Sequence, residues 1–326
     1  MTTDTMRALV ATGYGEPEQL TIAELDVPRP GPGQILVKIA ASTINPTDLR
    51  VVTGGYRDLV DLEFPYTLGN EFAGTVVEAG PGVSQYGVGD EVFGLALPRQ
   101  LRLAADPVRP SLSTGALAEF AVFEADTPAV AHRPAALDPE RAVALPIAGG
   151  TTLAIMDTAK IRPGETVLVI GATGAVGLTL IPALAAAGAE IVATARTAEA
   201  ADLLSSLGAG RTARYDDYPE DVDVVLNLAL SADGLPSAAR SLRPGGRLIS
   251  IVFPPPDPSQ LGRDDVELGY VMHMGDESTG ARAVAEAALA GRLSTPIARR
   301  YALADGVEAA TDYARRHPLG KIVVTV

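Results

Sequence analysis

A short apolar run followed at once by three evenly spaced glycines constrains this chain more than any other feature. Residues 167–170 have the composition of a buried parallel strand. Gly171, Gly174 and Gly177 come next, and glycines here allow positive φ and a close backbone approach to a pyrophosphate. Residues 176–187 then predict a helix whose free N–H groups and positive dipole end would face that pyrophosphate. This order predicts a dinucleotide site, with an ordinary tight turn as the alternative. The expected cofactor-binding loop comprises Gly171, Ala172, Thr173, Gly174, Ala175, Val176 and Gly177.

The second strand of this region indicates which dinucleotide is bound. Sites for NAD usually place Asp or Glu at the end of that strand to bind the ribose 2′-hydroxyl. In this chain the predicted strand, 191–195, ends on Ala195 and is followed by Arg196. A guanidinium there can pair with a 2′-phosphate through two charge-assisted hydrogen bonds. We therefore expect NADP(H), unless Arg196 is simply a solvated loop residue.

Composition limits the class of protein. A chain of 326 residues has room for two domains, and an apolar fraction of 47% supports sizeable cores. The net charge of −14 argues against nucleic acid and anionic membranes as partners. The absence of cysteine excludes disulfides and thiolate zinc sites. We see neither a signal peptide nor an apolar run long enough to span a membrane, so we expect a cytoplasmic protein.

The pattern of predicted strands and helices changes twice along the chain. Residues 1–130 consist of short alternating runs between Gly/Pro-rich turns, which is typical of a small β-barrel. Residues 131–272 alternate strands with helices, which predicts an α/β domain with a doubly wound parallel sheet. Residues 273–326 return to the pattern of residues 1–130, so we expect the second domain to be inserted into the first. The expected elements here are strands at 167–170, 191–194, 222–226, 247–252, 297–301 and 322–326, and helices at 176–187, 197–207, 235–242, 280–290 and 306–316.

Several ordered motifs resemble those of one family. They lie at residues 30–37, 45–48, 68–74, 87–94, 115–120, 145–152, 171–177, 243–248 and 320–323. In this order they resemble the medium-chain dehydrogenases/reductases, and more closely the zinc-free quinone oxidoreductases that include zeta-crystallin. The resemblance covers almost the whole chain. It implies a GroES-like substrate domain (1–130 and 273–326), a Rossmann NADP-binding domain (131–272) and a homodimer.

Metal binding is not expected. Asn45 and Asn70 stand where the zinc-dependent alcohol dehydrogenases of this superfamily have Cys and His, and amides are poor zinc ligands. The three histidines, His132, His273 and His317, lie far apart and show no ligand spacing. The resemblance also implies that residues 270–274 form a strand paired across the dimer interface near the cleft, which singles out His273.

Without a Lewis acid, the resemblance implies hydride transfer to an acceptor that is already electrophilic, such as a quinone or an enone. It places Asn45 beside the substrate, where the amide can donate to a developing oxyanion, and Tyr56 in the same cleft as a donor. The alternatives are that Asn45 serves the turn before Pro46 and that Tyr56 is a packed loop aromatic. Asp48 either orients this loop or caps a helix.

The resemblance adds further cofactor residues. Tyr215 matches a tyrosine beside the adenosine 2′-phosphate, and Thr152 and Val252 complete the expected cofactor site. A lysine that some relatives use against this phosphate is replaced by Ala200, so Arg196 must supply most of the charge.

The sequence therefore predicts an NADPH-dependent, zinc-independent reductase of a quinone or α,β-unsaturated carbonyl. An enoyl thioester reductase of polyketide or secondary metabolism is an alternative within the same chemistry. A non-catalytic NADPH-binding structural or regulatory protein is an alternative of another class, since fold does not fix function. In each reading we expect small-molecule ligands and neither nucleic acid nor membrane.

Overall fold

The computed structural model describes residues 5–58, 61–98, 112–215, 217–273 and 275–326. It divides into two compact units, the first formed by 1–150, 274–289 and 297–326, and the second by 151–273 and 290–296. The sequence places the first change of domain near residue 130. In the structure β10 (Val130–His132) pairs with β6 (Glu91–Leu95), so the first unit continues past residue 130, and this segment of it ends at Gly150. Residues 290–296, expected with the substrate domain, belong to the second unit.

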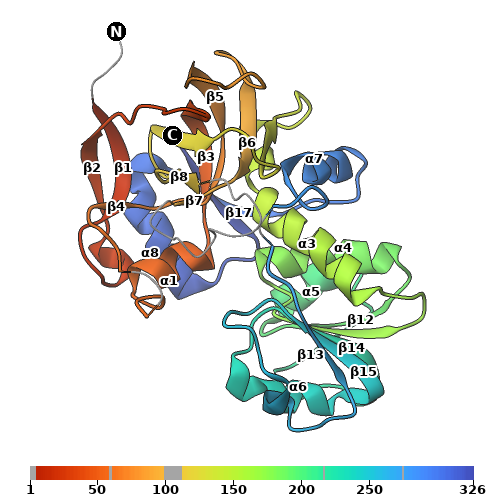
Figure 1. Ribbon diagram of the computed structural model, residues 1–326. Coiled ribbons are helices and arrows are strands. Elements are labelled where there is room, and N and C mark those ends of the chain that lie inside the picture. Colours follow the sequence, from red (N-terminus) through yellow and green to blue (C-terminus); the bar gives the residue numbers. More distant parts are fainter. Residues whose placement is uncertain (1–4, 59–60, 99–111, 216, 274) are drawn as a thin grey trace. The chain divides into compact units, whose positions relative to one another are not determined.

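The first unit is rich in β-structure (Figure 1). Strands β2-β1-β4 form a small antiparallel sheet, and a larger sheet runs in the order β10-β6-β5-β3-β9-β8-β7. The last strand, β18, pairs with β3 on one side and β17 on the other, which ties the end of the chain into this sheet. The elements are β1 (Thr5–Ala11), η1 (Pro17–Gln19), β2 (Thr21–Asp26), β3 (Gln34–Ile44), α1 (Pro46–Val52), β4 (Tyr66–Thr67), β5 (Glu71–Ala79), β6, β7 (Leu97–Pro98), β8 (Leu112–Ser113), β9 (Phe120–Glu124), β10, α2 (Pro139–Val143), α7 (Ala281–Leu289), β17 (Ile297–Ala302), η5 (Leu303–Asp305), α8 (Gly306–Arg316) and β18 (Lys321–Thr325).

Two of the apolar clusters in the described part of the first unit lie around β3. In one, Ile35 and Val37 of β3 pack with Phe72 and Phe123, whose rings stack with their centroids 3.7 Å apart. The other lies around α1 and α8 and includes Ile44, at the end of β3. Strand β3 contributes to both clusters, so the polar residues at its end are held by apolar packing.

The second unit contains a six-stranded parallel sheet in the order β13-β12-β11-β14-β15-β16. Helix α6 lies on the opposite face of this sheet from α4 and α5 (Figure 1). This is the doubly wound order of a Rossmann domain, and the predicted fold class is confirmed. The elements are α3 (Pro146–Ala159, which begins in the first unit), β11 (Thr166–Ile170), α4 (Ala175–Ala186), β12 (Glu190–Thr194), α5 (Ala198–Ser206), β13 (Arg211–Ala213), β14 (Val222–Asn227), η3 (Ala232–Gly234), α6 (Leu235–Arg240), β15 (Leu242–Ser250), η4 (Pro258–Leu261) and β16 (Glu267–Tyr270).

Most predicted elements match the structure within one or two residues, and the helix at 306–316 coincides with α8. The strand expected at 247–252 is different. Strand β15 ends at Ser250, the last residue that pairs with both β14 and β16, so Val252 lies beyond the sheet. In the part of the chain that the structure describes, no helix has the length and apolarity that a membrane span requires.

Candidate active site

The glycine turn lies between β11 and α4 in the second unit. Gly171 has a φ of +86°, a conformation that favours glycine. Gly174 is the N-cap of α4 in an extended conformation, and no side chain forms a capping hydrogen bond there. The Thr194 hydroxyl accepts a hydrogen bond from the Gly171 N–H at 3.0 Å and so fixes the start of the turn. The first N–H groups of α4 are left without a side-chain cap, which is the arrangement that binds anions.

The glycines of this turn have different spatial roles. A Cβ added at Gly174 would meet only the Gly171 carbonyl oxygen, at 3.5 Å, so the space beside Gly174 is open. A Cβ at Gly177 would lie 2.4 Å from the Ala172 oxygen, because the helix packs closely on the turn. The open space at Gly174 fits an approaching pyrophosphate, and Gly177 serves the packing.

Arg196 and Tyr215 meet near the carboxyl ends of neighbouring strands, just after β12 and β13. The guanidinium carbon of Arg196 lies 4.8 Å from the centroid of the Tyr215 ring. Such a cation–π contact orients the guanidinium and leaves its N–H groups available. Among the described residues, no carboxylate forms an ion pair with Arg196. Thr197, the next residue, caps α5 by accepting from the Ala200 N–H, which fixes the backbone beside Arg196.

The other two cofactor candidates lie in different settings. Thr152 on α3 is fully buried, and its hydroxyl has no hydrogen-bond partner in the described structure. A buried polar group without a partner is costly, and because this hydroxyl is enclosed its expected contact with the cofactor stays a prediction. Val252 is half-buried and its N–H donates to the Ser250 hydroxyl at 3.2 Å.

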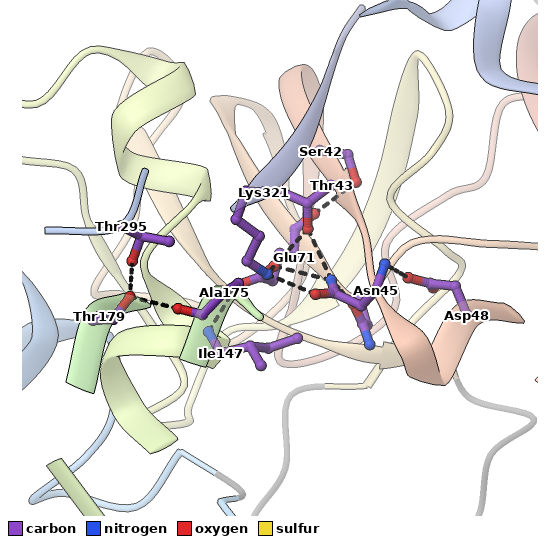
Figure 2. A network of polar contacts seen from close by, with 11 residues as sticks. Ser42, Thr43, Asn45, Asp48, Glu71, Ile147, Ala175, Thr179, Thr295 and Lys321 are labelled. Atoms are coloured by element: carbon purple, nitrogen blue, oxygen red, sulfur yellow. Dashed lines mark hydrogen bonds and ion pairs between the residues drawn. The ribbon is translucent and has the colours of Figure 1, made fainter. Parts of the chain in front are cut away.

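A buried polar cluster occupies the first unit (Figure 2). It consists of Lys321, Glu71, Asn45, Thr43 and Asn70, and we refer to it as the Lys321 cluster. The side chains of Lys321 and Glu71 are 2% and 0% exposed, and they form an ion pair. Lys321 Nζ also donates to Asn45 Oδ1 at 2.6 Å. Burying two charges is costly unless both are fully hydrogen-bonded, and here they are held by several partners.

Strand pairing brings the Lys321 cluster together. Strand β3 lies between β18 and β5, so the start of β18, the end of β3 and the start of β5 are neighbours. Glu71 Oε2 accepts from the Thr43 hydroxyl and from Asn45 Nδ2, and Glu71 Oε1 accepts from the Ile147 N–H at 2.7 Å. That N–H belongs to the first turn of α3, whose positive dipole end stabilises a carboxylate.

Asn45 is the N-cap of α1, and Asp48 in the first turn accepts from its backbone N–H at 2.8 Å. Asp48 also accepts from the Gly69 N–H at 3.0 Å and so orients this loop; the helix cap is Asn45 and not Asp48. Burial raises the pKa of Asp48 to about 7 against the effect of these two hydrogen bonds. The Asn45 side chain is engaged at both ends of its amide, so its expected contact with a substrate stays a prediction.

Tyr56 follows α1 in the loop at 53–58. Its ring packs against the apolar cluster around α1, and the Arg50 guanidinium carbon lies 5.0 Å from the ring centroid. Burial raises the pKa of the phenol, and the charge of Arg50 partly offsets this. The packed-aromatic alternative describes the surroundings of Tyr56 well, and its role as a donor stays a prediction.

The three histidines occupy separate places. His132 lies 3.2 Å from Asp90, His317 ends α8 with a φ of +46°, and His273 is half-buried beyond β16. Among the described residues, no three metal-binding side chains of His, Cys, Asp or Glu gather at one point. The strand expected over 270–274 is not there, because β16 ends at Tyr270 and residues 271–273 lie outside it, with Met274 outside the described residues. Strand β16 pairs with β15 of the same chain, and the predicted pairing across a dimer is untested.

Comparisons with known proteins identify the family. Residues 31–134 match the alcohol dehydrogenase GroES-like domain, and residues 187–324 match the zinc-binding dehydrogenase family. The chain is 32% identical over 259 residues to the quinone oxidoreductase of Rattus norvegicus, covering 76% of this chain and 73% of that protein. The chain belongs to the medium-chain dehydrogenase/reductase superfamily, in the branch of the quinone oxidoreductases.

Two further similar proteins are a polyketide synthase and a protein solved with NADPH. The chain is 34% identical over 249 residues to a mycocerosic acid synthase-like polyketide synthase of Mycobacterium tuberculosis, covering 73% of this chain and 11% of that protein. It therefore spans about a tenth of the length of the polyketide synthases it matches. A mycobacterial protein solved in complex with NADPH is 27% identical with a TM-score of 0.81, covering 98% of this chain and 100% of that one.

Proposed function

We propose that this chain is an NADPH-dependent reductase that delivers hydride to a quinone or to a C=C bond conjugated with a carbonyl. The observation that carries this proposal is the start of α4, which has no side-chain cap and has open space beside Gly174. In the same unit the Arg196 guanidinium lies over the Tyr215 ring. The turn suits a pyrophosphate and the guanidinium suits a 2′-phosphate. Bound NADPH supplies the hydride, and the protein supplies position and hydrogen bonds.

Cofactor preference gives the first test. Arg196→Ala should reduce the preference for NADPH over NADH by about 1.5–3 kcal/mol, because a charge-assisted phosphate contact is lost. Fluorescence titration of both cofactors measures it. Arg240→Ala removes the same charge from an exposed position at the end of α6 and should leave the preference unchanged. Equal affinity of the wild-type protein for NADPH and NADH would contradict the assignment.

The choice of acceptor rests on Asn45 and Asn70. Amide groups hold zinc poorly, so the acceptor has to be electrophilic without a Lewis acid. Quinones and enones meet that condition. The similarity to a polyketide synthase favours enoyl thioesters as the second candidate class.

We also propose a homodimer, which sedimentation equilibrium tests.

A panel of acceptors tests the proposed function. Protein and NADPH are mixed with small quinones, enones or enoyl thioesters, and the absorbance of the reduced cofactor is followed. We expect turnover with at least one quinone or enone. Turnover with enoyl thioesters alone would favour the second candidate. Tight NADPH binding with no turnover on any acceptor would indicate a non-catalytic binder.

We propose that Asn45 and Tyr56 both serve the substrate. Asn45→Ala should lower kcat by about 10²-fold, because Asn45 belongs to the hydrogen-bond network that preorganises donors to the charge developing in the transition state. Tyr56→Phe should have little effect if the proton comes from solvent. The dissociation constant of NADPH should stay close to that of the wild-type protein in both variants. Wild-type rates in both variants would show that these residues do not serve the substrate.

A further inference from the structure

We propose that Asn70 presents the amide hydrogen that binds the carbonyl oxygen of the substrate, and that Lys321 and Asn45 fix the orientation of that amide. This inference rests on the proposed reductase function and deepens it. It changes the role of Asn45 from a group that touches the substrate to a positioning residue.

Lys321 determines the orientation of the Asn45 amide. An ammonium group has donors and no acceptor, so the side-chain atom of Asn45 that faces Lys321 must be the carbonyl oxygen. Lys321 Nζ lies 2.6 Å from Asn45 Oδ1. The NH₂ group of Asn45 therefore points to the other side of the amide.

The two amide hydrogens of Asn45 are both used inside the cluster. Its Nδ2 carries two hydrogens and faces three acceptors, namely Thr43 Oγ1 at 2.8 Å, Asn70 Oδ1 at 2.7 Å and Glu71 Oε2 at 3.0 Å. Asn45 as a whole is 4% exposed. Both hydrogens are already used within the cluster, so Asn45 has none to offer to a substrate.

Asn45 in turn determines the orientation of the Asn70 amide. Its Oδ1 accepts from Asn45, so its own NH₂ group points away from Asn45. Within the described residues this NH₂ donates no hydrogen bond, and it is not one of the enclosed polar atoms that lack a partner. Its backbone is held, since the Asn70 carbonyl accepts from the Ala96 N–H at 2.9 Å. Asn70, a residue that is 2% exposed, thus carries an unused donor on a backbone that is itself held by a hydrogen bond.

A donor of this kind suits the proposed reaction. When hydride arrives at the β-carbon of an enone, the π electrons of the C=C bond move toward the carbonyl and negative charge develops on its oxygen. A preorganised amide stabilises that oxygen without giving up a proton. Solvent then protonates the α-carbon, which gives the saturated ketone.

The experiment compares Asn70→Ala, Asn45→Ala and the double variant. Asn70→Ala should lower kcat by about 10²-fold with the NADPH dissociation constant unchanged. Because Asn45 acts through Asn70, the double variant should be no slower than Asn70→Ala. Asn70→Ser keeps a hydroxyl donor and should recover part of the rate, and circular dichroism checks that each variant is folded. Losses that multiply in the double variant, or a wild-type rate for Asn70→Ala, would overturn the inference.

A second readout is independent of turnover. A phenolate carries its charge on an oxygen, as the reacting acceptor does, and 4-nitrophenolate can be titrated against the protein without cofactor above the pKa of the phenol. The wild-type protein should bind it at least tenfold more tightly than Asn70→Ala. Equal affinities, or no binding to the wild-type protein, would contradict the assignment of Asn70. Failure of the acceptor panel with phenolate binding intact would instead count against the proposed function.

Discussion

Replacing Lys321 by Met is expected to lower the free energy of unfolding by about 3–5 kcal/mol, because Glu71 is left as a buried charge without its cation. Both side chains are almost fully buried, and the Met side chain fills the space without supplying a donor. Asn45 loses its partner at Oδ1 in the same variant. Urea unfolding followed by circular dichroism measures the change.

Two further variants serve as a control and as a rescue of Lys321→Met. Lys38→Met changes an exposed lysine on β3 and should cost less than about 0.5 kcal/mol. Adding Glu71→Gln to Lys321→Met removes the unpaired charge and should recover part of the loss. A loss below about 1 kcal/mol for Lys321→Met would show that the ion pair contributes little beyond what its desolvation costs.

Replacing Gly174 by Val is expected to weaken NADPH binding by about 10³-fold or more, because the branched side chain fills the space beside the start of α4. Two or three charge-assisted hydrogen bonds to a pyrophosphate would be lost, each contributing about 1.5–3 kcal/mol. The fold should tolerate the change, since a Cβ there meets no atom closer than 3.5 Å. Fluorescence titration with NADPH measures the affinity.

Gly13 provides the matched control for this variant. A Cβ at Gly13 meets no atom within 4 Å, so Gly13→Val makes the same chemical change on an open surface outside the turn. Its affinity for NADPH should equal that of the wild-type protein. A folded Gly174→Val protein with unchanged affinity would mean that the pyrophosphate binds elsewhere.

The strand, turn and helix of the proposed cofactor site could be predicted from the sequence because their signals are local. The strand, the glycine turn and the helix follow one another directly, and the structure has β11 and α4 there. Arg196 and Tyr215 were also expected near the same phosphate, and the structure brings them into contact. The edge strands β13 and β16 were not predicted, because each is three or four residues long and lacks a continuous apolar pattern.

The Lys321 cluster could not be predicted, because its members come together only through sheet pairing. Lys321 and Glu71 are 250 positions apart, and nothing in the residues around either indicates a buried ion pair. The motif containing Asn45 was recognised, but the direction of its amide depends on Lys321. Periodicity reports which face of an element is buried, and it does not report which polar groups meet there.

Deuterium transfer tests the central claim most directly. The protein is incubated with its best enone and NADPH that carries deuterium at the transferable C4 position, and the product is analysed by mass spectrometry and NMR. Direct hydride delivery predicts one deuterium at the β-carbon of each product molecule and slower cofactor oxidation than with unlabelled NADPH. A product without deuterium, or no product with any quinone, enone or enoyl thioester, would contradict the account.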